Sequence, residues 1–348
     1  MKITIKLLLL FFLTASLFFS ISYIEKMLEC EKHTEKWGYI DKTGEMVIEP
    51  QFWKAGPFVE DIAPVLIGEA CMPFQNHKCK WGFIDKEGRV VGKSKYWAVT
   101  GFYDGMAAVK EGEDCVRNYC KWGYINTTGK LVIEPEYYSY SNFSEGIAAV
   151  GIEEECWYNP NHCKHIYIDK ENIIIVEGAF SDAKPFSEGL AAVKVDGKWG
   201  YIDKRGEMIT ELLFGVSRPF NEGLAAVGVG RDCYETSGAC VWGVIEKNGK
   251  YIIEPQYEDI KAFNEGIAAA KIHEKYGFIN VNGEMVIEPR YDDAKNFSSG
   301  IACVSICDSV EAKGGCKWGF IDKEGDFIIE PYSRFEKSFS EGLVEVCY

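Results

Sequence analysis

A short motif built around a Trp-Gly pair returns eight times along this chain of 348 residues, and its clearest copy reads KWGYIDKRGE at 198–207. The tryptophan, or the residue that replaces it, stands at positions 37, 81, 122, 165, 199, 242, 276 and 318. Successive copies lie 44, 41, 43, 34, 43, 34 and 42 residues apart, so the basic unit has 34 residues and five intervals contain insertions. Such a period predicts a fold assembled from copies of one supersecondary unit.

Each unit reads as three antiparallel strands, which we call a, b and c. In one copy, strands a and b are the apolar runs 190–195 and 198–203, separated by Asp196-Gly197, a strong two-residue hairpin signal. A turn containing Gly206 follows, where a positive φ is expected, and strand c comes next. A recurring proline such as Pro50 is expected to end strand c. About ten further residues, at roughly 3.3 Å each, return the chain to the next unit as a short fourth strand or an extended crossing.

The fourth copy departs from the motif, because His165-Ile166 replaces Trp-Gly. We expect the lost ring volume and the gained side chain to offset each other within tightly packed layers. His162, Cys163 and His165 also resemble a metal-binding cluster, but His165 fills the tryptophan position and is interpreted as a packed core residue.

The cysteines follow the insertions. Each of the five long intervals contains one pair, and neither short interval does; the pairs are Cys71 with Cys79, Cys115 with Cys120, Cys156 with Cys163, Cys233 with Cys240, and Cys307 with Cys316. The second cysteine always stands two residues before the tryptophan position, where the tight a–b turn has been lengthened. These spacings do not match the short pairs of zinc sites, so five disulfides are predicted, each worth roughly 2–3 kcal/mol.

Three cysteines remain: Cys30, Cys303 and Cys347. The array starts at strand b, at Lys36, and ends after a lone strand a at 342–346. Pairing of that strand with the first strand b would close the array, so the sequence favours a closed propeller-like ring over an open β-solenoid. A Cys30–Cys347 disulfide is predicted to latch the ring, and Cys303 is predicted to be a buried thiol.

The repeated pattern K-W-G-[YF]-I-[DN], continued through I-E-P and F-[SN]-E-G-[LI]-A-A-V, resembles the WG-repeat family of bacterial β-repeats. The best copies are 36–50, 121–135 and 317–331, and the resemblance covers residues 36–347. It implies a bacterial, often exported, non-catalytic repeat protein, and it supplies no ligand or catalytic residue to carry over. The predicted all-β fold therefore consists of eight tandem antiparallel repeats of three to four strands, in a WG-type domain at 36–348.

The N-terminus reads as an export signal. Lys2 and Lys6 precede an apolar run at 7–19, and small residues at Ser20 and Ser22 follow, as expected of a signal peptide over 1–22. An uncleaved membrane anchor is the alternative. Residues 23–35 are interpreted as a linker in both cases. The net charge of −15 disfavours nucleic acid and anionic lipid as partners. We expect an exported protein in the periplasm, outside the cell or at its surface, in contact with a membrane only through this segment.

The sequence contains no specific catalytic set and implies no cofactor or metal. The glutamate before the turn glycine recurs at 145, 188, 222, 265 and 341, and a repeated position of this kind is more often structural. The regularly spaced aromatic residues are interpreted as a stacked core rather than a carbohydrate platform. The enlarged loops all leave the same turn, so they are the best candidate binding surface; the candidate residues are Met72, Phe74, His77, Trp157, Tyr158 and His162.

These observations favour a non-catalytic scaffold that binds an unknown protein through the disulfide-clamped loops. A binder of cell-wall or cell-surface glycans is the alternative, and a glycoside hydrolase that uses two of the turn glutamates is a third interpretation. The sequence indicates no oligomeric state.

Overall fold

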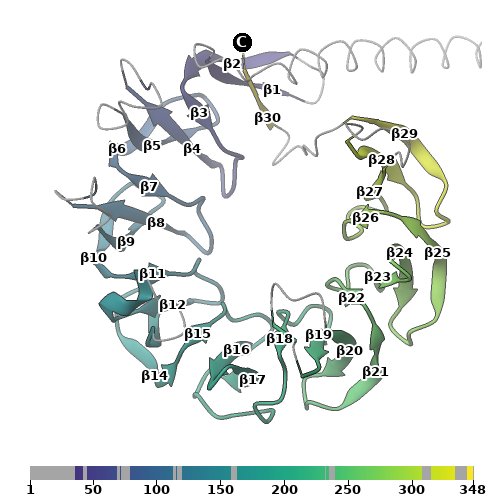
Figure 1. The fold of residues 1–348 in the computed structure, drawn as a ribbon. Helices are drawn as coiled ribbons and strands as arrows, with labels where there is room; N and C mark the ends of the chain where they lie inside the picture. The colour runs from purple at the N-terminus through teal and green to yellow at the C-terminus, as the bar shows by residue number, and fades with distance from the viewer. Residues whose placement is uncertain are drawn as a thin grey trace, which may run out of the picture. The chain divides into compact units, whose positions relative to one another are not determined.

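The computed structural model describes residues 36–41, 45–68, 71, 79–112, 115, 120–157, 163–231, 233–234, 240–307, 315–333 and 343–347. The chain divides into two compact units, Tyr137–Glu336 and the remainder of the chain on either side of it. The first unit holds the sheets made from β1 to β10 and β30, and the second holds the sheets made from β11 to β29 (Figure 1).

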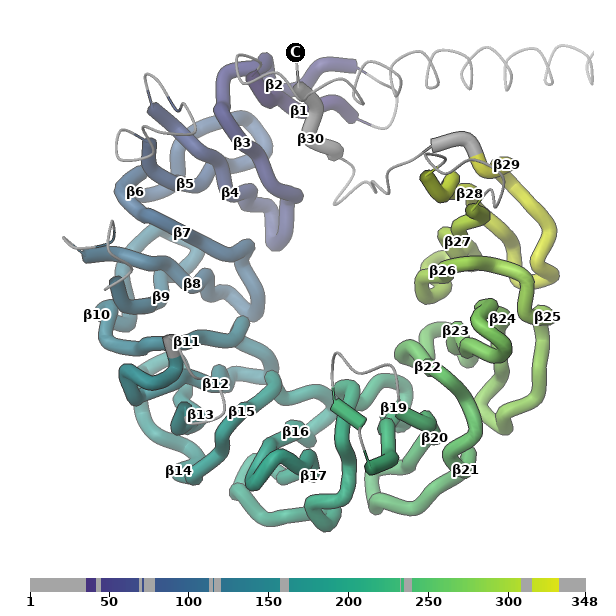
Figure 2. The backbone as a smooth tube through the Cα atoms, viewed as in Figure 1, coloured from purple at the N-terminus to yellow at the C-terminus, as the bar shows by residue number. Residues whose placement is uncertain are grey.

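The described strands form eight sheets, six with four strands and two with three. Neighbouring strands pair antiparallel, as in the order β11-β12-β13-β14, and Figure 2 follows the chain through that sheet. The chain crosses each full sheet from one edge to the other, so consecutive strands are neighbours. The all-β prediction is confirmed.

Strand a lies second in each full sheet and includes the small residues of the Ala-Ala motif. Its copies are β4 (Ile62–Ile67), β8 (Met106–Glu111), β12 (Ile147–Gly151), β16 (Leu190–Val195), β19 (Leu224–Val229), β23 (Ile267–Ile272), β27 (Ala302–Ile306) and β30 (Leu343–Cys347). Strand b carries the Trp-Gly pair. Its copies are β1 (Trp37–Asp41), β5 (Lys80–Asp85), β9 (Lys121–Asn126), β13 (His165–Asp169), β17 (Lys198–Asp203), β20 (Val241–Glu246), β24 (Lys275–Asn280) and β28 (Lys317–Ile321).

Strand c forms the far edge of its sheet. Its copies are β2 (Met46–Phe52), β6 (Val90–Tyr96), β10 (Leu131–Tyr137), β14 (Ile174–Phe180), β21 (Tyr251–Tyr257), β25 (Met285–Tyr291) and β29 (Phe327–Ser333). In the sheet of β15, β16 and β17, only isolated bridges from Trp199 to Phe214 and from Ile202 to Met208 take its place. The predicted return segment forms a two-residue strand at the near edge of the next sheet. Its copies are β3 (Lys54–Ala55), β7 (Ala98–Val99), β11 (Ser139–Tyr140), β15 (Asp182–Ala183), β18 (Val216–Ser217), β22 (Asp259–Ile260) and β26 (Asp293–Ala294).

The lone C-terminal strand completes the first sheet, which has the order β2-β1-β30. Trp37 pairs with Cys347 and Asp41 pairs with Leu343, in the register that strands a and b share elsewhere. The expected pairing between the last strand and the first strand b is therefore confirmed.

The proline of the I-E-P motif does not end strand c, contrary to the prediction. In β21, Val244 pairs with Ile253 and Trp242 pairs with Tyr257, so three residues of strand c oppose the single residue Gly243. Pro255 lies in this bulge, and the strand continues beyond it. A β-carbon on Gly243 would lie 2.7 Å from the carbonyl oxygen of Ile253 and 2.9 Å from the proline nitrogen, so the motif requires glycine here because of crowding.

In the fourth repeat, where His165-Ile166 replaces Trp-Gly, the structure differs from the expectation that the lost ring volume makes room for the isoleucine side chain. His165 pairs with Phe180 and Tyr167 pairs with Val176, so Ile166 opposes residues 177–179. Gly178 stands there in place of the usual proline, and Ile166 is only 4% exposed. The usual proline ring is therefore absent opposite the isoleucine, and the ring of Phe180 fills the place that a β-carbon on Gly178 would take.

Candidate functional site

The a–b turn is the part of the repeat that carries the insertions. All five predicted cysteine pairs lie at disulfide-bonding distance, at the point where strand a ends and strand b begins. The Cα–Cα separations are 5.5 Å for Cys71 and Cys79, 4.8 Å for Cys115 and Cys120, 4.3 Å for Cys156 and Cys163, 4.5 Å for Cys233 and Cys240, and 4.0 Å for Cys307 and Cys316. Each pair therefore joins the two ends of an enlarged loop, at the same end of its sheet.

The disulfides hold the necks of the loops, and one cysteine of each pair is the better covered in most cases. The second cysteine of each pair is well covered: Cys79, Cys120, Cys163 and Cys240 are buried, and Cys316 is half-buried. A disulfide at this position can hold the neck of its loop.

Most of the predicted binding residues fall outside the described part of the chain. Met72, Phe74, His77, Tyr158 and His162 lie there, as do Cys30, Glu341 and the predicted segments 1–22 and 23–35. Trp157 ends the short 3₁₀ helix η3 (Glu154–Trp157), directly after Cys156. Cys303 belongs to none of the five disulfides and is only half-buried, so the prediction of a buried thiol is wrong. Its cross-strand partner Phe320 is also half-buried, so β27 is less covered here than the strands a that have an alanine at this position.

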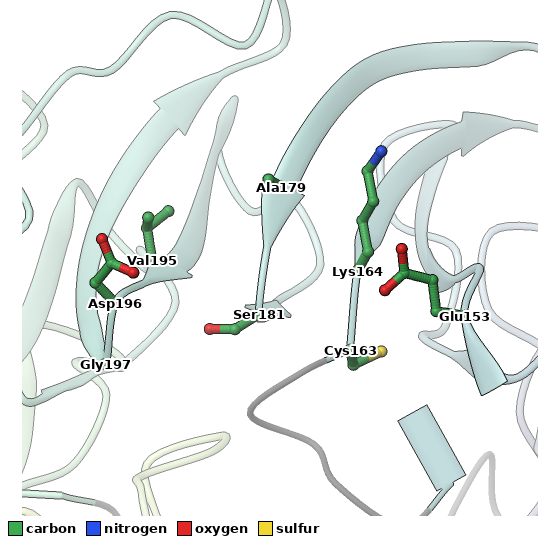
Figure 3. A pocket seen from close by; sticks show the side chains of 8 residues that line it. All are labelled: Glu153, Cys163, Lys164, Ala179, Ser181, Val195, Asp196 and Gly197. Atoms are coloured by element: carbon green, nitrogen blue, oxygen red, sulfur yellow. The ribbon is translucent and has the colours of Figure 1, made fainter. Parts of the chain in front are cut away.

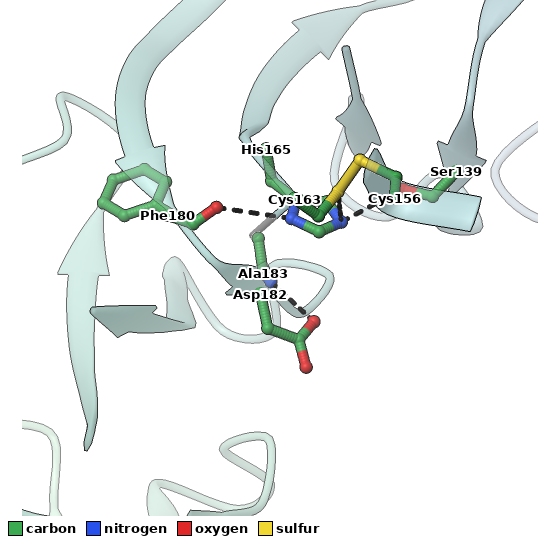
Figure 4. Close-up of a disulfide and its surroundings, with 7 residues drawn as sticks. All are labelled: Ser139, Cys156, Cys163, His165, Phe180, Asp182 and Ala183. Carbon is green, nitrogen blue, oxygen red and sulfur yellow. Dashed lines mark hydrogen bonds between the residues drawn. A yellow bond between two sulfur atoms is a disulfide. The ribbon is translucent and has the colours of Figure 1, made fainter. Parts of the chain in front are cut away.

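His165 lies beneath the Cys156–Cys163 disulfide as part of the packing (Figure 4). Its Nδ1 lies 3.3 Å from the carbonyl oxygen of Phe180, which can only accept, and its Nε2 lies 3.0 Å from Ser139 Oγ and 3.4 Å from Cys163 Sγ. Burial lowers the pKa of His165 despite the opposing charge of Asp182, so the ring is neutral at pH 7. Both nitrogens have protein partners, which agrees with the interpretation of a packed residue.

A groove of about 590 Å³ opens at this end of the second unit, between the sheets of β13 and β17 (Figure 3). One wall is the stem of the clamped loop, with Glu153 and Lys164; the other wall is the tight turn at Asp196-Gly197, and Ser181 lies between them. Within the described residues, the side chains of Glu153, Lys164 and Asp196 have no hydrogen-bond or ion-pair partner. The groove therefore presents one cation and two anions to a ligand.

Sequence reasoning missed this groove, although it singled out both of the turns that form the walls. Asp196 was interpreted only as a hairpin residue, and Lys164 was considered only as a neighbour of the candidate metal cluster. An alignment of the repeats at the residue that follows strand c could have pointed to it, because Ser181 and Gly215 are small there, whereas Trp53, Trp97, Tyr138, Glu258 and Asp292 are aromatic or acidic.

The aromatic residues are used mainly inside the array. An aromatic side chain of strand b packs edge to face against the phenylalanine 19 residues later, in the next sheet. The ring centroids are 4.8 Å apart for Tyr39–Phe58, 5.0 Å for Phe83–Phe102 and Tyr167–Phe186, 4.8 Å for Tyr201–Phe220 and 4.9 Å for Phe278–Phe297.

The best-covered tryptophans lie under cations of the same array. Trp199 is fully buried with Lys184 Nζ 4.5 Å from its ring centroid, and Arg218 lies 4.8 Å from the ring of Trp242. These two rings have no free face for a sugar, so they act as core residues.

The recurring turn glutamates link neighbouring repeats. Each carboxylate accepts a hydrogen bond from the backbone N–H of the turn glycine in the next repeat. The pairs are Glu60–Gly105 at 2.8 Å, Glu145–Gly189 at 3.1 Å, Glu188–Gly223 at 2.8 Å, Glu222–Gly266 at 2.8 Å and Glu265–Gly300 at 3.1 Å. A lysine completes three of these contacts: Lys204 with Glu145, Lys247 with Glu188 and Lys323 with Glu265.

These contacts lower the pKa of two glutamates. Burial acts to raise the pKa of Glu188, but the Lys247 ammonium and the Gly223 N–H together outweigh it and leave the pKa below its usual value. Lys323 and the Gly300 N–H lower the pKa of Glu265. The described turn glutamates with these bonds therefore have a structural use as hydrogen-bond acceptors between repeats.

The family model of the WG containing repeat matches the chain eight times. The matched segments are residues 37–69, 81–113, 122–155, 167–199, 199–230, 242–276, 276–306 and 318–348. No curated protein sequence matches the chain. Within the described residues, no helix has the length and apolar character needed to cross a membrane.

Solved structures with similar folds are only distantly related in sequence. A eukaryotic initiation factor is 10% identical with a TM-score of 0.54, over 88% of this chain and 83% of that chain. The β-propeller domain of the Trilobed protease from Pyrococcus furiosus is 9% identical with a TM-score of 0.43, over 82% of this chain and 96% of that domain. The acylaminoacyl peptidase of Pyrococcus horikoshii is 11% identical with a TM-score of 0.43, and the match covers 80% of this chain and 52% of the peptidase. At these identities the likeness concerns the fold alone.

Proposed function

Because this chain belongs to the WG containing repeat family, we propose that it is an exported, non-catalytic scaffold that binds a protein partner through its disulfide-clamped loops. The observation that carries the proposal is the placement of all five cysteine pairs at the a–b turn of their sheets. Insertions confined to one turn of a repeat are typical of a binding face. Disulfides also persist in oxidising compartments, which supports export.

Two further observations support a scaffold without catalysis. Four of the turn glutamates that sequence analysis considered as carboxylates for sugar hydrolysis are each bonded to the neighbouring repeat. The buried Trp199 and Trp242 rings are also covered, so a glycan-binding role would depend on other aromatic side chains, such as those of the loops.

We further propose that the eight repeats close into a ring rather than an open solenoid. The pairing of β30 with β1 supports this, because it joins the two ends of the repeat array in one sheet. The predicted Cys30–Cys347 latch is tested by peptide mapping under non-reducing conditions, where an unlinked pair of peptides would contradict it.

The binding role is tested by photo-crosslinking from two ends of the same repeat. Glu154, in η3 beside the clamped loop, and Glu171, in the b–c turn, are both exposed and lie at opposite ends of β13. A photoreactive residue at 154 is expected to capture a discrete partner among the extracellular proteins of the source organism, whereas one at 171 is expected to capture none. Equal capture from both positions would argue against a dedicated loop face.

Replacement of residues 156–163 by a tight Asp-Gly turn is the matching loss-of-function variant. The loop-deleted protein is expected to keep its fold, since two repeats already have such a turn, and to lose the crosslinked partner. A glycan array with the full-length protein tests the alternative; strong binding to one glycan, lost on loop deletion, would favour a glycan ligand over a protein.

A further inference from the structure

A single residue joins strand c to the two-residue strand of the next sheet, and we call it the linking residue. Its backbone N–H donates to strand a of the next sheet in every repeat for which the bond is described; examples are Ser181 to Lys194, Glu258 to Lys271 and Asp292 to Ser305. The linking residue therefore lies at the same point in each repeat, next to the lysine that precedes the tryptophan position.

In two repeats an aromatic linking residue covers that lysine. Lys36 Nζ lies 3.4 Å from the ring centroid of Trp53, and Lys80 Nζ lies 3.1 Å from that of Trp97. Cation–π contact therefore satisfies the ammonium group within the fold.

In another repeat a carboxylate takes the same place. Asp292 accepts from Lys275 Nζ at 2.5 Å and from the backbone N–H of Cys307 at 2.8 Å. One carboxylate thus connects the lysine of its own repeat with the a–b turn of the next one. Glu258 makes half of this arrangement, accepting from the Glu274 N–H at 3.0 Å, and the lysine position beside it is occupied by Val241.

Where the linking residue is Gly215, the next disulfide fills the space. A β-carbon on Gly215 would lie 2.7 Å from the sulfur of Cys233. This repeat therefore leaves no room beside Lys198, although that lysine also has no partner within the described residues.

Among the linking positions compared above, the groove is the place where this position is neither covered, paired nor filled. The linking residue is Ser181, whose hydroxyl donates to the carbonyl of Lys194 and so turns away from Lys164. Lys164 has no partner, and the backbone N–H groups of the Asp196-Gly197 turn have no acceptor within the described residues. The donors that Asp292 satisfies in its own repeat are here left open to solvent.

We propose that this groove binds a ligand carrying both a carboxylate and an ammonium group, such as a peptide with a free C-terminus and a basic side chain. The ligand carboxylate takes the place that Asp292 occupies in its repeat, accepting from Lys164 and from the turn N–H groups. Glu153 and Asp196 at the rim attract the ammonium group and disfavour a simple anion. The volume lies within the range of small-molecule sites, about 300–1,000 Å³.

This inference deepens the proposed function, because it names one ligand chemistry on the loop face. The probe is the dipeptide Gly-Lys with a free carboxylate, titrated into the full chain at low ionic strength by calorimetry. We expect millimolar binding at one site, weakened at least about tenfold in the C-terminal amide, which lacks the charged acceptor. Undetectable binding of Gly-Lys, or equal binding of its amide, would overturn the inference.

Three variants locate the site. Ser181→Asp places a carboxylate beside Lys164, as Asp292 is placed beside Lys275, and should abolish binding without lowering the melting temperature. Lys164→Met should weaken binding at least about tenfold, and it keeps the test valid if the first variant fails to fold. Lys198→Met, at the same repeat position beside a filled space, is the matched control and should bind like the wild type. Unchanged binding in the first two variants would refute the assignment.

The outcome also separates the two proposals. If Gly-Lys fails to bind but the photoreactive residue at 154 still captures a partner, the scaffold function stands and the groove ligand is wrong. If Gly-Lys binds as described and no partner is captured, the groove is a small-ligand site and the protein-binding function is wrong.

Discussion

Substitution of Gly243 by alanine tests why the repeat needs its Trp-Gly pair. The added β-carbon would lie 2.7 Å from the carbonyl oxygen of Ile253, at least about 0.6 Å inside an ordinary C···O contact. Both opposing atoms belong to backbone that is fixed in the sheet, so strand c must move. Overpacking of this kind costs about 1–3 kcal/mol, and the lower entropy of the unfolded alanine chain offsets about 0.4–1 kcal/mol of it. We expect a net loss of about 1–2 kcal/mol.

The matched control is Gly200→Ala in the repeat without a regular strand c. There the β-carbon would lie 2.8 Å from Met208 Cε and 3.0 Å from the carbonyl oxygen of Glu211. Met208 is 46% exposed and flexible, so it can move aside at little cost, and we expect a change near zero. Only the first variant should lower the thermal unfolding midpoint, by about 2–8 °C for a unit of this size.

Circular dichroism in the far ultraviolet during heating gives the two midpoints directly. A second variant adds Pro255→Gly to Gly243→Ala, which reproduces the fourth repeat, where a larger residue on strand b faces Gly178 on strand c. This double variant should recover part of the lost stability. Gly243→Ala no less stable than Gly200→Ala would show that crowding against strand c is not the reason for the glycine.

Three further predictions concern the contacts between and within repeats. Replacing Cys156 and Cys163 together by serine should lower stability by about 2.5 kcal/mol, and a reductant should then cause less further loss than in the wild type, as measured by thermal unfolding. The folded-state pKa of Glu188 is depressed, so its contribution to the free energy of unfolding is present above the unfolded-state pKa of about 4.3 and is lost as the pH falls through the folded-state pKa. In a plot of the urea denaturation midpoint against pH, Glu188→Gln should therefore show a smaller fall at acid pH than the wild type. Tyr201→Phe removes the hydroxyl that donates to the Arg218 carbonyl at 2.5 Å and should cost about 1–3 kcal/mol in urea denaturation, since that carbonyl loses its partner; an unchanged midpoint would contradict this.

The sequence predicted the parts of the fold that depend on local pattern. The Asp196-Gly197 turn and the alternation of strand b determine the a–b hairpin, and the insertions lead directly to the cysteine pairs. The position of the proline was mispredicted because a proline after apolar residues reads as a strand end. Its place in a bulge depends on the opposite glycine, and that pairing becomes apparent only when the strand register is known.

Contacts between repeats could not be predicted in the same way. Glu188 and Gly223 are 35 positions apart, and their bond depends on how one sheet lies against the next. The groove has the same origin. Glu153, Lys164, Ser181 and Asp196 come from two neighbouring repeats, and no stretch of sequence contains them as a motif. The sequence does show that Ser181 occupies the linking position, but the consequence becomes clear only when the contacts of Asp292 and Glu258 at the same position are known.

The second tight turn allows the groove chemistry to be built where it does not exist. The tight turn His273-Glu274 follows the repeat with the Cys233–Cys240 loop, just as Asp196-Gly197 follows the repeat with the Cys156–Cys163 loop. Two features differ at this second turn. Glu258 accepts a hydrogen bond from the Glu274 N–H, and Val241 stands in place of the lysine. The double variant Glu258→Ser with Val241→Lys restores both features of the first site. We expect calorimetry with Gly-Lys to change from about one bound dipeptide to about two, whereas Val241→Lys alone should stay at one because Glu258 then pairs with the new lysine. A double variant that still binds a single dipeptide would mean that an unpaired lysine and free turn N–H groups are not sufficient for the site.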